Sequence, residues 1–395
     1  MTKLSSIADY VTDKISSNDI ALREYVTTDC ILQNKKGREI ATNLPPQSCC
    51  LTRYQRGDVL IANIRPYLKK VWFADIDGGA SSDVLVFRAK EGHSPSFLYA
   101  VLLQDSFFDY VMQGAKGSKM PRGDKEQILR YEMPTLSCSE ESIGTFFLNL
   151  DQKIRLNEQI NQNLEAMAKQ LYDYWFVQFD FPNEEGKPYK SSGGEMVWNE
   201  KLKRKIPNEW DNCKLKDFIN LFDSKRIPLS SKDREERKGN YPYYGATGIM
   251  DYVNEYIFDG DYILLAEDGS TSDSKGFPIV QYIWGKNWVN NHAHIILPKN
   301  EQYLMFTYQM LRSIPAKQIE TGSIQKKISQ ENLCEYNMVL PNSILIEKYE
   351  SIISPLWEKR KLCIEEINAL IKQRDELLPL LMNGQASVNS DLSDD

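Results

Sequence analysis

Two aspartates and a lysine in the second half of the chain are residue types that metal-dependent nucleases use. Asp261 is followed by the run Asp273-Ser274-Lys275, which loosely fits an Asp…(Asp/Glu)-x-Lys pattern. In such sites two carboxylates hold Mg²⁺ and the lysine assists the attacking water. The pattern is short, and Asp261 after Gly260 also suits a turn. A nuclease is therefore an alternative and not our main prediction.

Other catalytic patterns are missing from the sequence. It contains no GxxxxGK[ST] phosphate loop, no glycine-rich cofactor loop and no nucleophile elbow. His292 and His294 could share one face of a strand, as two metal ligands would, but no cysteine or carboxylate motif lies beside them at ligand spacing. We expect ordinary strand residues here, and neither a catalytic residue nor a bound metal in this chain.

Basic residues beside aromatic ones favour contact with nucleic acid. Lysine and arginine displace counterions from the phosphate backbone, although solvated surface charge is the alternative for each single residue. The candidates in the first half are Lys35, Lys36, Arg38, Arg65, Tyr67, Lys69, Lys116, Lys119 and Arg122. The candidates in the second half are Lys225, Arg226, Tyr243, Tyr244, Lys275, Ser323, Gln325, Lys326 and Lys327.

Length and composition indicate a globular protein of two or three domains. The chain has 395 residues, of which 42% are hydrophobic and 26% charged. Its net charge of −7 is unexpected for a protein that binds DNA strongly by itself. This balance suggests that partner subunits supply much of the charge that neutralises phosphates.

No segment of the sequence predicts a membrane span or a secretory signal. The apolar runs are too short for a bilayer, and Met1–Tyr10 has no apolar core. The seven cysteines include no CxxC pair, which argues against a disulfide framework or structural zinc. We therefore expect a cytoplasmic protein.

A long amphipathic helix is predicted over residues 139–181. Alternating steps of four and three residues connect its apolar positions, which is the pattern of a coiled-coil seam. The positions are Ile143, Phe147, Leu150, Ile154, Asn157, Asn161, Leu164, Ala168, Leu171 and Trp175. At about 1.5 Å per residue the helix should reach about 50 Å. A helix of this length needs a partner to bury its apolar stripe.

The predicted partner helix lies over residues 342–384. A shift of 206 residues places Leu150 on Leu356 and Leu164 on Leu370, although two unrelated amphipathic helices would also fit. The predicted seam residues are Leu150, Ile154, Leu164, Leu171, Leu356, Ile367, Leu370 and Leu377.

The segments between the helices also repeat. Gly260-Asp261 follows Gly57-Asp58 by 203 residues, and Gly322-Ser323 follows Gly117-Ser118 by 205. A constant order with small drift is expected of a duplicated unit of about 200 residues. The predicted organisation is a domain over 1–138, a helix over 139–181, a linker over 182–210, a domain over 211–341, a helix over 342–384 and a disordered tail over 385–395. Antiparallel packing of the helices would give a rigid spacer and pseudo-twofold symmetry.

The order of several motifs resembles the specificity subunit of Type I restriction–modification systems (the HsdS family), and the resemblance covers nearly the whole chain. The motifs that carry it are Leu171-Tyr172-Asp173-Tyr174-Trp175-Phe176, Gly186-Lys187-Pro188-Tyr189, Pro242-Tyr243-Tyr244-Gly245-Ala246-Thr247-Gly248, Trp288-Val289-Asn290-Asn291 and Leu377-Leu378-Pro379-Leu380-Leu381.

The resemblance implies an α/β (α+β) fold with two tandem target recognition domains, each with a twisted sheet. Each domain would read one half of a split DNA target, and the helices would set the spacer and bind two modification (methyltransferase) subunits. Those partners would use S-adenosylmethionine for adenine methylation, and restriction subunits would use ATP and Mg²⁺. On this interpretation the chain is not an enzyme, binds no cofactor itself and contacts double-stranded DNA. A coiled-coil scaffold that binds no DNA remains a further alternative.

Polar seam residues and differences between the halves complete the prediction. Asn157 and Asn161, with Arg360 and Arg374, could fix antiparallel register or leave a polar face for the modification subunits. The first half has no equivalent of the Pro-x-Tyr-Gly-Ala motif. We therefore expect the two domains to read different sequences and the DNA target to be asymmetric.

Overall fold

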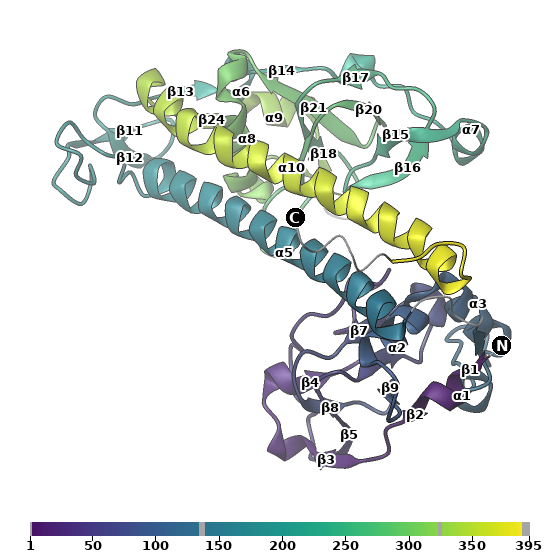
Figure 1. The fold of residues 1–395 in the computed structure, drawn as a ribbon. Coiled ribbons are helices and arrows are strands. Elements are labelled where there is room, and N and C mark those ends of the chain that lie inside the picture. Colours follow the sequence, from purple (N-terminus) through teal and green to yellow (C-terminus); the bar gives the residue numbers. More distant parts are fainter. Residues whose placement is uncertain (1, 134–138, 323–325, 389–395) are drawn as a thin grey trace. The chain divides into compact units, whose positions relative to one another are not determined.

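The computed structural model describes residues 2–133, 139–322 and 326–388. Contacts divide the chain into two units, one of residues 1–159 with 363–395 and the other of residues 160–362. Two long helices, α5 (Glu140–Tyr172) and α10 (Ser343–Met382), each contribute one part to either unit (Figure 1). We call the elements from Thr2 to Met133 the first head and those from Asp211 to Leu340 the second head.

The two helices pack in opposite directions within each unit. In the first unit, Ile143 and Phe147 near the start of α5 share a core with Leu378 and Leu381 near the end of α10. In the second unit, the last part of α5 shares a core with the first part of α10 (Ala168, Tyr172, Ile346, Tyr349, Trp357). The heptad pattern is therefore used as an antiparallel pair. Helix α5 ends in a π-helical turn, Asp173–Val177.

The inner sheet of each head, defined as the sheet that packs against the long helices, has four antiparallel strands. In the first head the order is β2 (Ala8–Tyr10), β9 (Val84–Ala89), β6 (Val59–Ala62), β7 (Val71–Phe73). In the second head it is β14 (Ile219–Leu221), β21 (Ala293–Pro298), β18 (Tyr262–Ala266), β19 (Val280–Ile283). The identical topology confirms the internal duplication and the α/β fold class.

Side chains of the inner sheets alternate between two cores. In β6, Val59 and Ile61 face the core that includes α5, whereas Leu60 faces a second core with Tyr54. In β18, Ile263 and Leu265 face the helix core, whereas Leu264 faces the other side. Because successive residues of a strand point to opposite faces, a run that is apolar throughout forms a strand buried on both sides.

The outer sheet of each head covers the other face of the inner sheet, and the two outer sheets differ. The first has the order β3 (Lys14–Ser16), β5 (Cys50–Tyr54), β8 (Gly78–Ala80), β4 (Tyr25–Val26). The second has the order β16 (Ile249–Val253), β15 (Lys238–Tyr244), β20 (Lys286–Val289), β17 (Phe258–Asp259).

Both outer sheets contain a strand with one parallel and one antiparallel neighbour, β8 in the first head and β20 in the second. The fourth strand joins the antiparallel neighbour in the first head and the parallel neighbour in the second. The heads therefore share a framework but end in different edges.

The smaller elements also recur in most places. Equivalent pairs are β1–β10 (Thr2–Lys3, Glu132–Met133) and β13–β24 (Asp211–Lys214, Asn337–Leu340), α1 (Leu4–Ile7) and α6 (Leu215–Phe218), α2 (Pro95–Leu103) and α8 (Leu304–Ser313), and α4 (Lys125–Ile128) and α9 (Gln330–Glu335). The remaining elements are α3 (Asp105–Gln113), α7 (Ser231–Glu236) and the short pair β22–β23 (Glu320–Thr321, Lys327–Ile328).

The segment over 182–210, expected as a linker, carries a hairpin of β11 (Met196–Asn199) and β12 (Arg204–Pro207). Phe181 stacks on both Tyr189 and Trp210, at 4.6 and 5.1 Å between ring centroids. The prolines and glycines of this segment therefore form turns around an aromatic stack and not a free tether.

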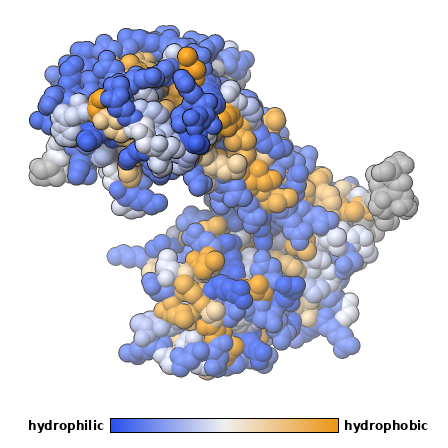
Figure 2. Space-filling model, turned by 90° about the vertical axis from the view of Figure 1, so that its left-hand side faces the viewer, coloured by the Kyte–Doolittle hydropathy of each residue, from blue (hydrophilic) through white to orange (hydrophobic). Residues whose placement is uncertain are grey.

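The exposed surface suits a molecule with a mean hydropathy of −0.48. The face shown in Figure 2 is mainly hydrophilic, with apolar side chains in scattered groups. Within the described residues, no helix combines the length and hydrophobicity that a membrane span requires.

Candidate nucleic-acid interface

Each head brings two loops together at the same end of its inner sheet. In the first head, the loop after β6 meets the loop before α4 through the bridge Ile64↔Arg122. In the second head, the loop after β18 meets the loop before α9 through the bridge Asp268↔Lys327. Most of the predicted DNA contacts lie on these loops, so the fold collects residues that are far apart in sequence.

Backbone strain is concentrated in the loops of the first head. Asn34, Lys35, Arg65 and Lys69 all have φ between 50° and 63°, a conformation that costs energy for residues other than glycine. Among the described non-glycine residues, only Phe179 and Lys203 share this feature. The strained residues belong to neighbouring loops, which are joined by two 2.9 Å backbone hydrogen bonds, from Asn34 to Leu68 and from Lys35 to Lys69. Strain of this kind is found mainly at functional sites.

Buried ion pairs hold the strained loops in place. Lys35 is only 6% exposed, and its Nζ lies 2.8 Å from Asp105 of α3 and 3.4 Å from Asp375 of α10. Lys69 also reaches Asp105, at 2.9 Å. Burial acts to raise the pKa of Asp105, but the hydrogen bonds from both lysines outweigh it and lower that pKa. Lys35 and Lys69 therefore fix the loops internally, and we do not retain them as phosphate contacts.

The other predicted residues of the first head differ in what they face. Arg38 lies over the Trp72 ring at 4.3 Å, Lys116 pairs with Asp124 and Arg122 pairs with Asp83. Exposed side chains without a carboxylate partner among the described residues, together with the adjacent tyrosine, form what we call the cationic loop cluster: Lys36, Arg65, Tyr67 and Lys119.

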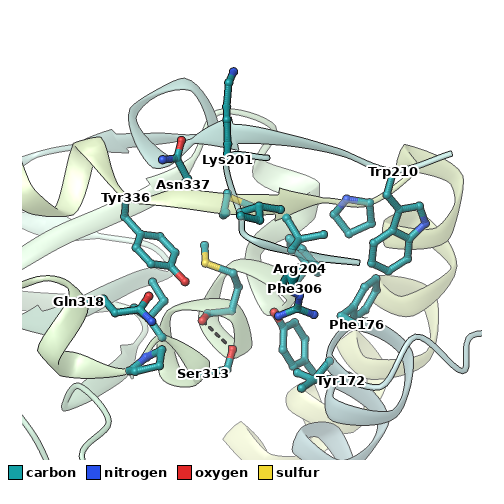
Figure 3. Close-up of a pocket in the computed structure, with 18 of the residues that line it drawn as sticks. Tyr172, Phe176, Lys201, Arg204, Trp210, Phe306, Ser313, Gln318, Tyr336 and Asn337 are labelled. Atoms are coloured by element: carbon teal, nitrogen blue, oxygen red, sulfur yellow. Dashed lines mark hydrogen bonds between the residues drawn. The ribbon is translucent and has the colours of Figure 1, made fainter. Parts of the chain in front are cut away.

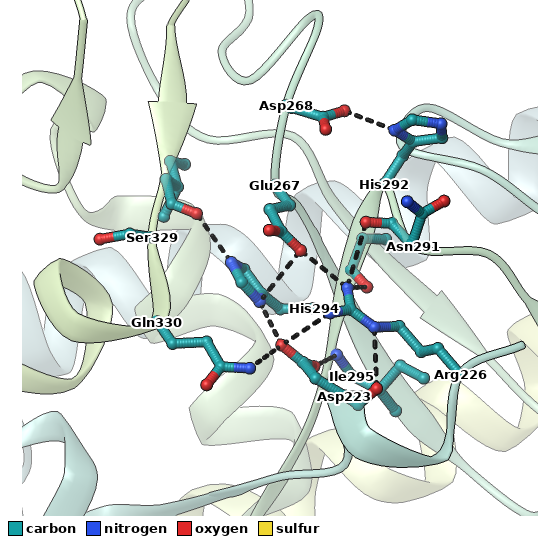
Figure 4. A network of polar contacts seen from close by, with 12 residues as sticks. Asp223, Arg226, Glu267, Asp268, Asn291, His292, His294, Ile295, Ser329 and Gln330 are labelled. Atoms are coloured by element: carbon teal, nitrogen blue, oxygen red, sulfur yellow. Dashed lines mark hydrogen bonds and ion pairs between the residues drawn. The ribbon is translucent and has the colours of Figure 1, made fainter. Parts of the chain in front are cut away.

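In the second head, the corresponding loop is acidic and internally neutralised. Arg226 is 12% exposed and binds Glu267 at 2.8 Å and Asp223 at 3.4 Å (Figure 4). Lys327 also pairs with Glu267, at 3.0 Å, and the exposed His292 contacts Asp268 at 2.7 Å. Arg226, predicted from sequence to face DNA, thus spends its charge inside the protein.

His294 lies at the centre of this network and is completely buried. Its Nδ1 is 2.5 Å from Asp223 and its Nε2 is 2.8 Å from the Ile328 carbonyl, so both nitrogens must donate a hydrogen bond. Burial raises the pKa of Asp223, but the hydrogen bond from His294 dominates the further effects that lower it.

Asp223, Glu267 and His294 are close enough to hold a metal ion, and they form the one such group in the part of the chain that the structure describes. However, the Arg226 guanidinium and the Gln330 amide, at 2.6 Å from Asp223, already donate to the carboxylates. Because both His294 nitrogens also face acceptors, the donor set fits a buried charge network better than a metal site.

The other predicted residues of the second head divide in the same way. Tyr243 is buried and its hydroxyl accepts a hydrogen bond from the Leu229 amide, and burial raises the pKa of the half-buried Tyr244 to about 12. Lys326 pairs with Glu320 at 3.0 Å. Lys225 and Lys275 are exposed without a carboxylate partner within the described ranges. Ser323 and Gln325 lie outside the described residues.

Sequence reasoning missed the exposed edge of the second outer sheet. Ile249, Met250 and Tyr252 of β16 are 47%, 55% and 50% exposed, and Thr247 at the preceding turn is also exposed. The turn signal Gly245-Ala246-Thr247-Gly248 between two strand-like runs could have predicted the hairpin. It could not have shown which side of β16 faces solvent.

The nuclease alternative is wrong. Asp261 forms an ion pair with Lys361 of α10 at 3.2 Å. Asp273 accepts hydrogen bonds from the backbone amides of Lys275 and Phe277 within its own turn. The pattern therefore consists of a helix contact and a turn, and not of carboxylates that converge on one ion.

The largest cavity-like feature lies in the second unit, at the end of α5 (Figure 3). It has a volume of about 520 Å³, and the aromatic side chains of Tyr172, Phe176, Trp210 and Tyr336 are among those that line it. Lys201 and Arg204 of the β11–β12 hairpin also line it. No predicted DNA contact belongs to its lining, so it is separate from both loop pairs.

The predicted helix seam is partly polar and mostly half-buried. Ile154 is 7% exposed, and the other predicted seam residues, half-buried, are Leu150, Leu164, Leu171, Leu356, Ile367, Leu370 and Leu377. Three charged contacts lie along it: Asn157 donates to Glu366 at 2.8 Å, Arg374 binds Asp151 at 3.3 Å and Arg360 binds Glu165 at 3.1 Å. Such contacts fit the proposed role of polar seam residues in fixing register.

Comparison with known proteins defines the class. Residues 207–367 match the family "Type I restriction modification DNA specificity domain". The chain is 23% identical to the Type I restriction enzyme MjaIX specificity subunit of Methanocaldococcus jannaschii, over 95% of this chain and 86% of that protein. It is 22% identical to the HindI specificity subunit of Haemophilus influenzae, over 91% and 94% of the two chains.

The fold leads to the same class. The crystal structure of a Type I S subunit from M. genitalium superposes with a TM-score of 0.60 at 16% identity, covering 96% of this chain and 95% of that one. The chain belongs to the family of Type I restriction–modification specificity subunits, which recognise DNA and are not catalytic.

Proposed function

We propose that each head of this specificity subunit reads one half of a bipartite, asymmetric DNA target. The target recognition domains would comprise residues 1–138 and 211–341. The observation that carries this proposal is the duplicated inner sheet with different outer surfaces. A repeated framework gives both heads the same attachment to the helices, and different edges and loops give each head its own sequence preference.

The long helices then have two roles. Their length sets the number of unread base pairs between the half-sites, and their surface binds two modification subunits. Leu156 of α5 and Leu362 of α10, 206 residues apart in the repeat, are 51% and 60% exposed and would suit such contacts. S-adenosylmethionine belongs to the modification subunits, and ATP and Mg²⁺ belong to restriction subunits where these join. Since its substrate is chromosomal or incoming DNA, this assembly would act in the cytoplasm.

Methylation mapping tests the proposal. The chain is co-expressed with the modification subunit encoded beside it, and genomic DNA is sequenced for methylated adenines. We expect one split, asymmetric motif that disappears when this chain is omitted. A scaffold without DNA contacts would leave methylation absent or unaffected by the chain.

The spacer role has its own experiment. One helical turn is inserted into both α5 and α10. We expect a longer gap between unchanged half-sites, because each head keeps its reading surface. Altered half-sites with an unchanged gap would contradict the role of the helices as a spacer.

A further inference from the structure

The β15–β16 hairpin forms a two-stranded ribbon at the edge of the second outer sheet. In the described part of the chain, β16 pairs only with β15, so its other edge is free. Figure 1 shows this ribbon on the side of the head away from the β11–β12 hairpin. Its turn, Gly245–Gly248, leads directly into three large, half-exposed side chains, Ile249, Met250 and Tyr252. A contiguous exposed apolar group of this kind indicates an interaction surface.

The tip of the ribbon is held rigidly before any ligand binds. The Gln281 side chain of β19 donates hydrogen bonds to the carbonyls of Gly245 and Ala246, both at 3.0 Å. Asn290, which is 2% exposed, points its Nδ2 at the Met250 sulfur, 3.3 Å away. A side chain on Gly245 would collide with Met250, so glycine is required for this packing. Fixing these groups in advance reduces the entropy lost on binding.

The ribbon presents no unpaired negative charge. Asp251 is the only acidic residue between 238 and 253, and it binds Lys238 at 2.6 Å and Arg234 at 3.3 Å. Lys286, close to the base of the ribbon, lies over the Tyr256 ring at 4.7 Å and is exposed. The surroundings are therefore compatible with a polyanion, and residues 207–367, which match a DNA specificity domain, contain the whole ribbon.

We propose that the β15–β16 ribbon enters the major groove of the second half-site and that Thr247, Ile249, Met250 and Tyr252 contact thymine methyl groups. This inference rests on the proposed function. The major groove is about 12 Å wide and admits a two-stranded β-ribbon, and the thymine C5-methyl is its one apolar marker. The loop pair of the same head is neutralised by its own ion pairs, so apolar contacts distinguish this head from the first.

The test removes single methyl groups from the DNA. Once the motif is mapped, duplexes with deoxyuridine in place of each half-site thymine are bound to the complex of this chain with its modification subunits. We expect the loss of one contacted methyl to weaken binding about fourfold for the unmodified protein. The same replacement should have almost no effect on Met250→Ala or Ile249→Ala, because the contacting group is already gone.

A matched control is Trp198→Ala. Trp198 is 54% exposed on the β11–β12 hairpin, a second ribbon that carries no predicted DNA contact. This variant should keep the full fourfold sensitivity to deoxyuridine. Circular dichroism and normal recognition of the other half-site establish that each variant is folded.

The outcomes are distinct. If Met250→Ala and Ile249→Ala retain the sensitivity of the unmodified protein, or if the second half-site contains no A·T pair, the ribbon does not read thymine. If both variants lose assembly with the modification subunits instead, the surface docks a protein and the proposal is overturned. If the unmodified complex yields no motif at all, the proposed function itself fails.

Discussion

The two heads attach to the long helices at equivalent points but with different chemistry. In the first head, Gly144 of α5 lies directly against the backbone of α2, whose Phe97 amide is capped by Ser94. In the second head, Glu350 of α10, 206 residues after Gly144, accepts a hydrogen bond from the Phe306 amide of α8 at 2.7 Å. The start of a buried helix needs an acceptor for its free amides, which can come from the helix itself or from its neighbour.

A second pair of equivalent positions shows the same freedom. Tyr99 of α2 donates to the buried Asp151, which also binds Arg374. In the second head, Tyr308 of α8 packs against Trp357, 5.2 Å between ring centroids. Asp151 and Trp357 are 206 residues apart, so one repeat has a charged layer where the other has an aromatic layer. Duplicated frameworks can thus exchange polar for apolar contacts provided that every buried polar group keeps a partner.

The difference continues at the exposed ends. The first head displays the cationic loop cluster on strained backbone, whereas the second neutralises its loop charges and displays an apolar ribbon. This contrast predicts that the two half-sites are bound with different dependence on salt and on base methyl groups.

The largest expected effect comes from breaking the charged layer of the first unit. Asp151→Ala leaves Arg374, 4% exposed, without its buried partner and should lower the free energy of unfolding by about 3–5 kcal/mol. Denaturant unfolding of the full chain measures the change. Lys153→Ala, which removes an exposed ion pair with Glu366, is the control and should cost at most about 1 kcal/mol. Equal losses in both variants would show that the buried layer has no special weight.

The corresponding charge of the second unit should make stability depend on pH. Burial raises the pKa of Glu350 from 4.5 to about 7, so the native state binds this proton more tightly than the unfolded state. Stability should therefore fall as pH rises from about 4.5 to about 7 and level off above it, by about 3 kcal/mol at most.

Glu350→Gln removes this titration but keeps an acceptor for the Phe306 amide. We expect the variant to gain stability relative to the unmodified chain between pH 5 and pH 8, as measured by denaturant unfolding at each pH. Glu347→Gln, an exposed position on the same helix, serves as the control. A constant difference between Glu350→Gln and the unmodified chain across this range would mean that Glu350 does not titrate there.

The close contact of the first head predicts a smaller loss. Gly144→Ala places a methyl group against the Phe97 amide and the Ser96 side chain, which should cost about 1–3 kcal/mol because the backbone of α2 must move. The neighbouring exposed change Thr145→Ala should be nearly neutral. Thermal unfolding distinguishes the two. If Gly144→Ala were stabilising, α2 would not be in contact with α5.

The smallest expected effects concern DNA binding. Arg65→Ala with Lys119→Ala should weaken binding to all sequences and reduce the slope of log K against log salt by about 1.8, since two phosphate contacts are lost. Lys326→Ala with Lys327→Ala, expected from sequence to behave alike, should reduce the slope less. Both lysines are engaged with carboxylates, Glu320 and Glu267. Filter binding at 50–200 mM salt with the assembled complex gives both slopes, and equal reductions would contradict the contrast between the heads.

Features with a local signature were predictable from the sequence. The heptad spacing of residues 139–181 determined a long helix that needs a partner, and the constant offset near 206 indicated the duplication that the identical inner sheets confirm. The apolar runs at Val59–Ala62 and Tyr262–Ala266 determined buried strands, because periodicity reflects which faces a residue presents. The hairpin within residues 182–210 had a weaker signature, since its stability comes from a stack of rings about 20 to 30 residues apart.

Only the tertiary structure decided what each charge does. Lys35 and Asp375 are 340 residues apart in the chain and 3.4 Å apart in space, and Arg226 reaches Glu267 across 41 residues. A lysine or arginine in a basic loop has the same local sequence whether it meets a phosphate or a buried carboxylate. The sequence determined that two similar heads sit on paired helices. Packing decided which of their side chains remain free to contact DNA, because the partners that neutralise the others come from distant segments.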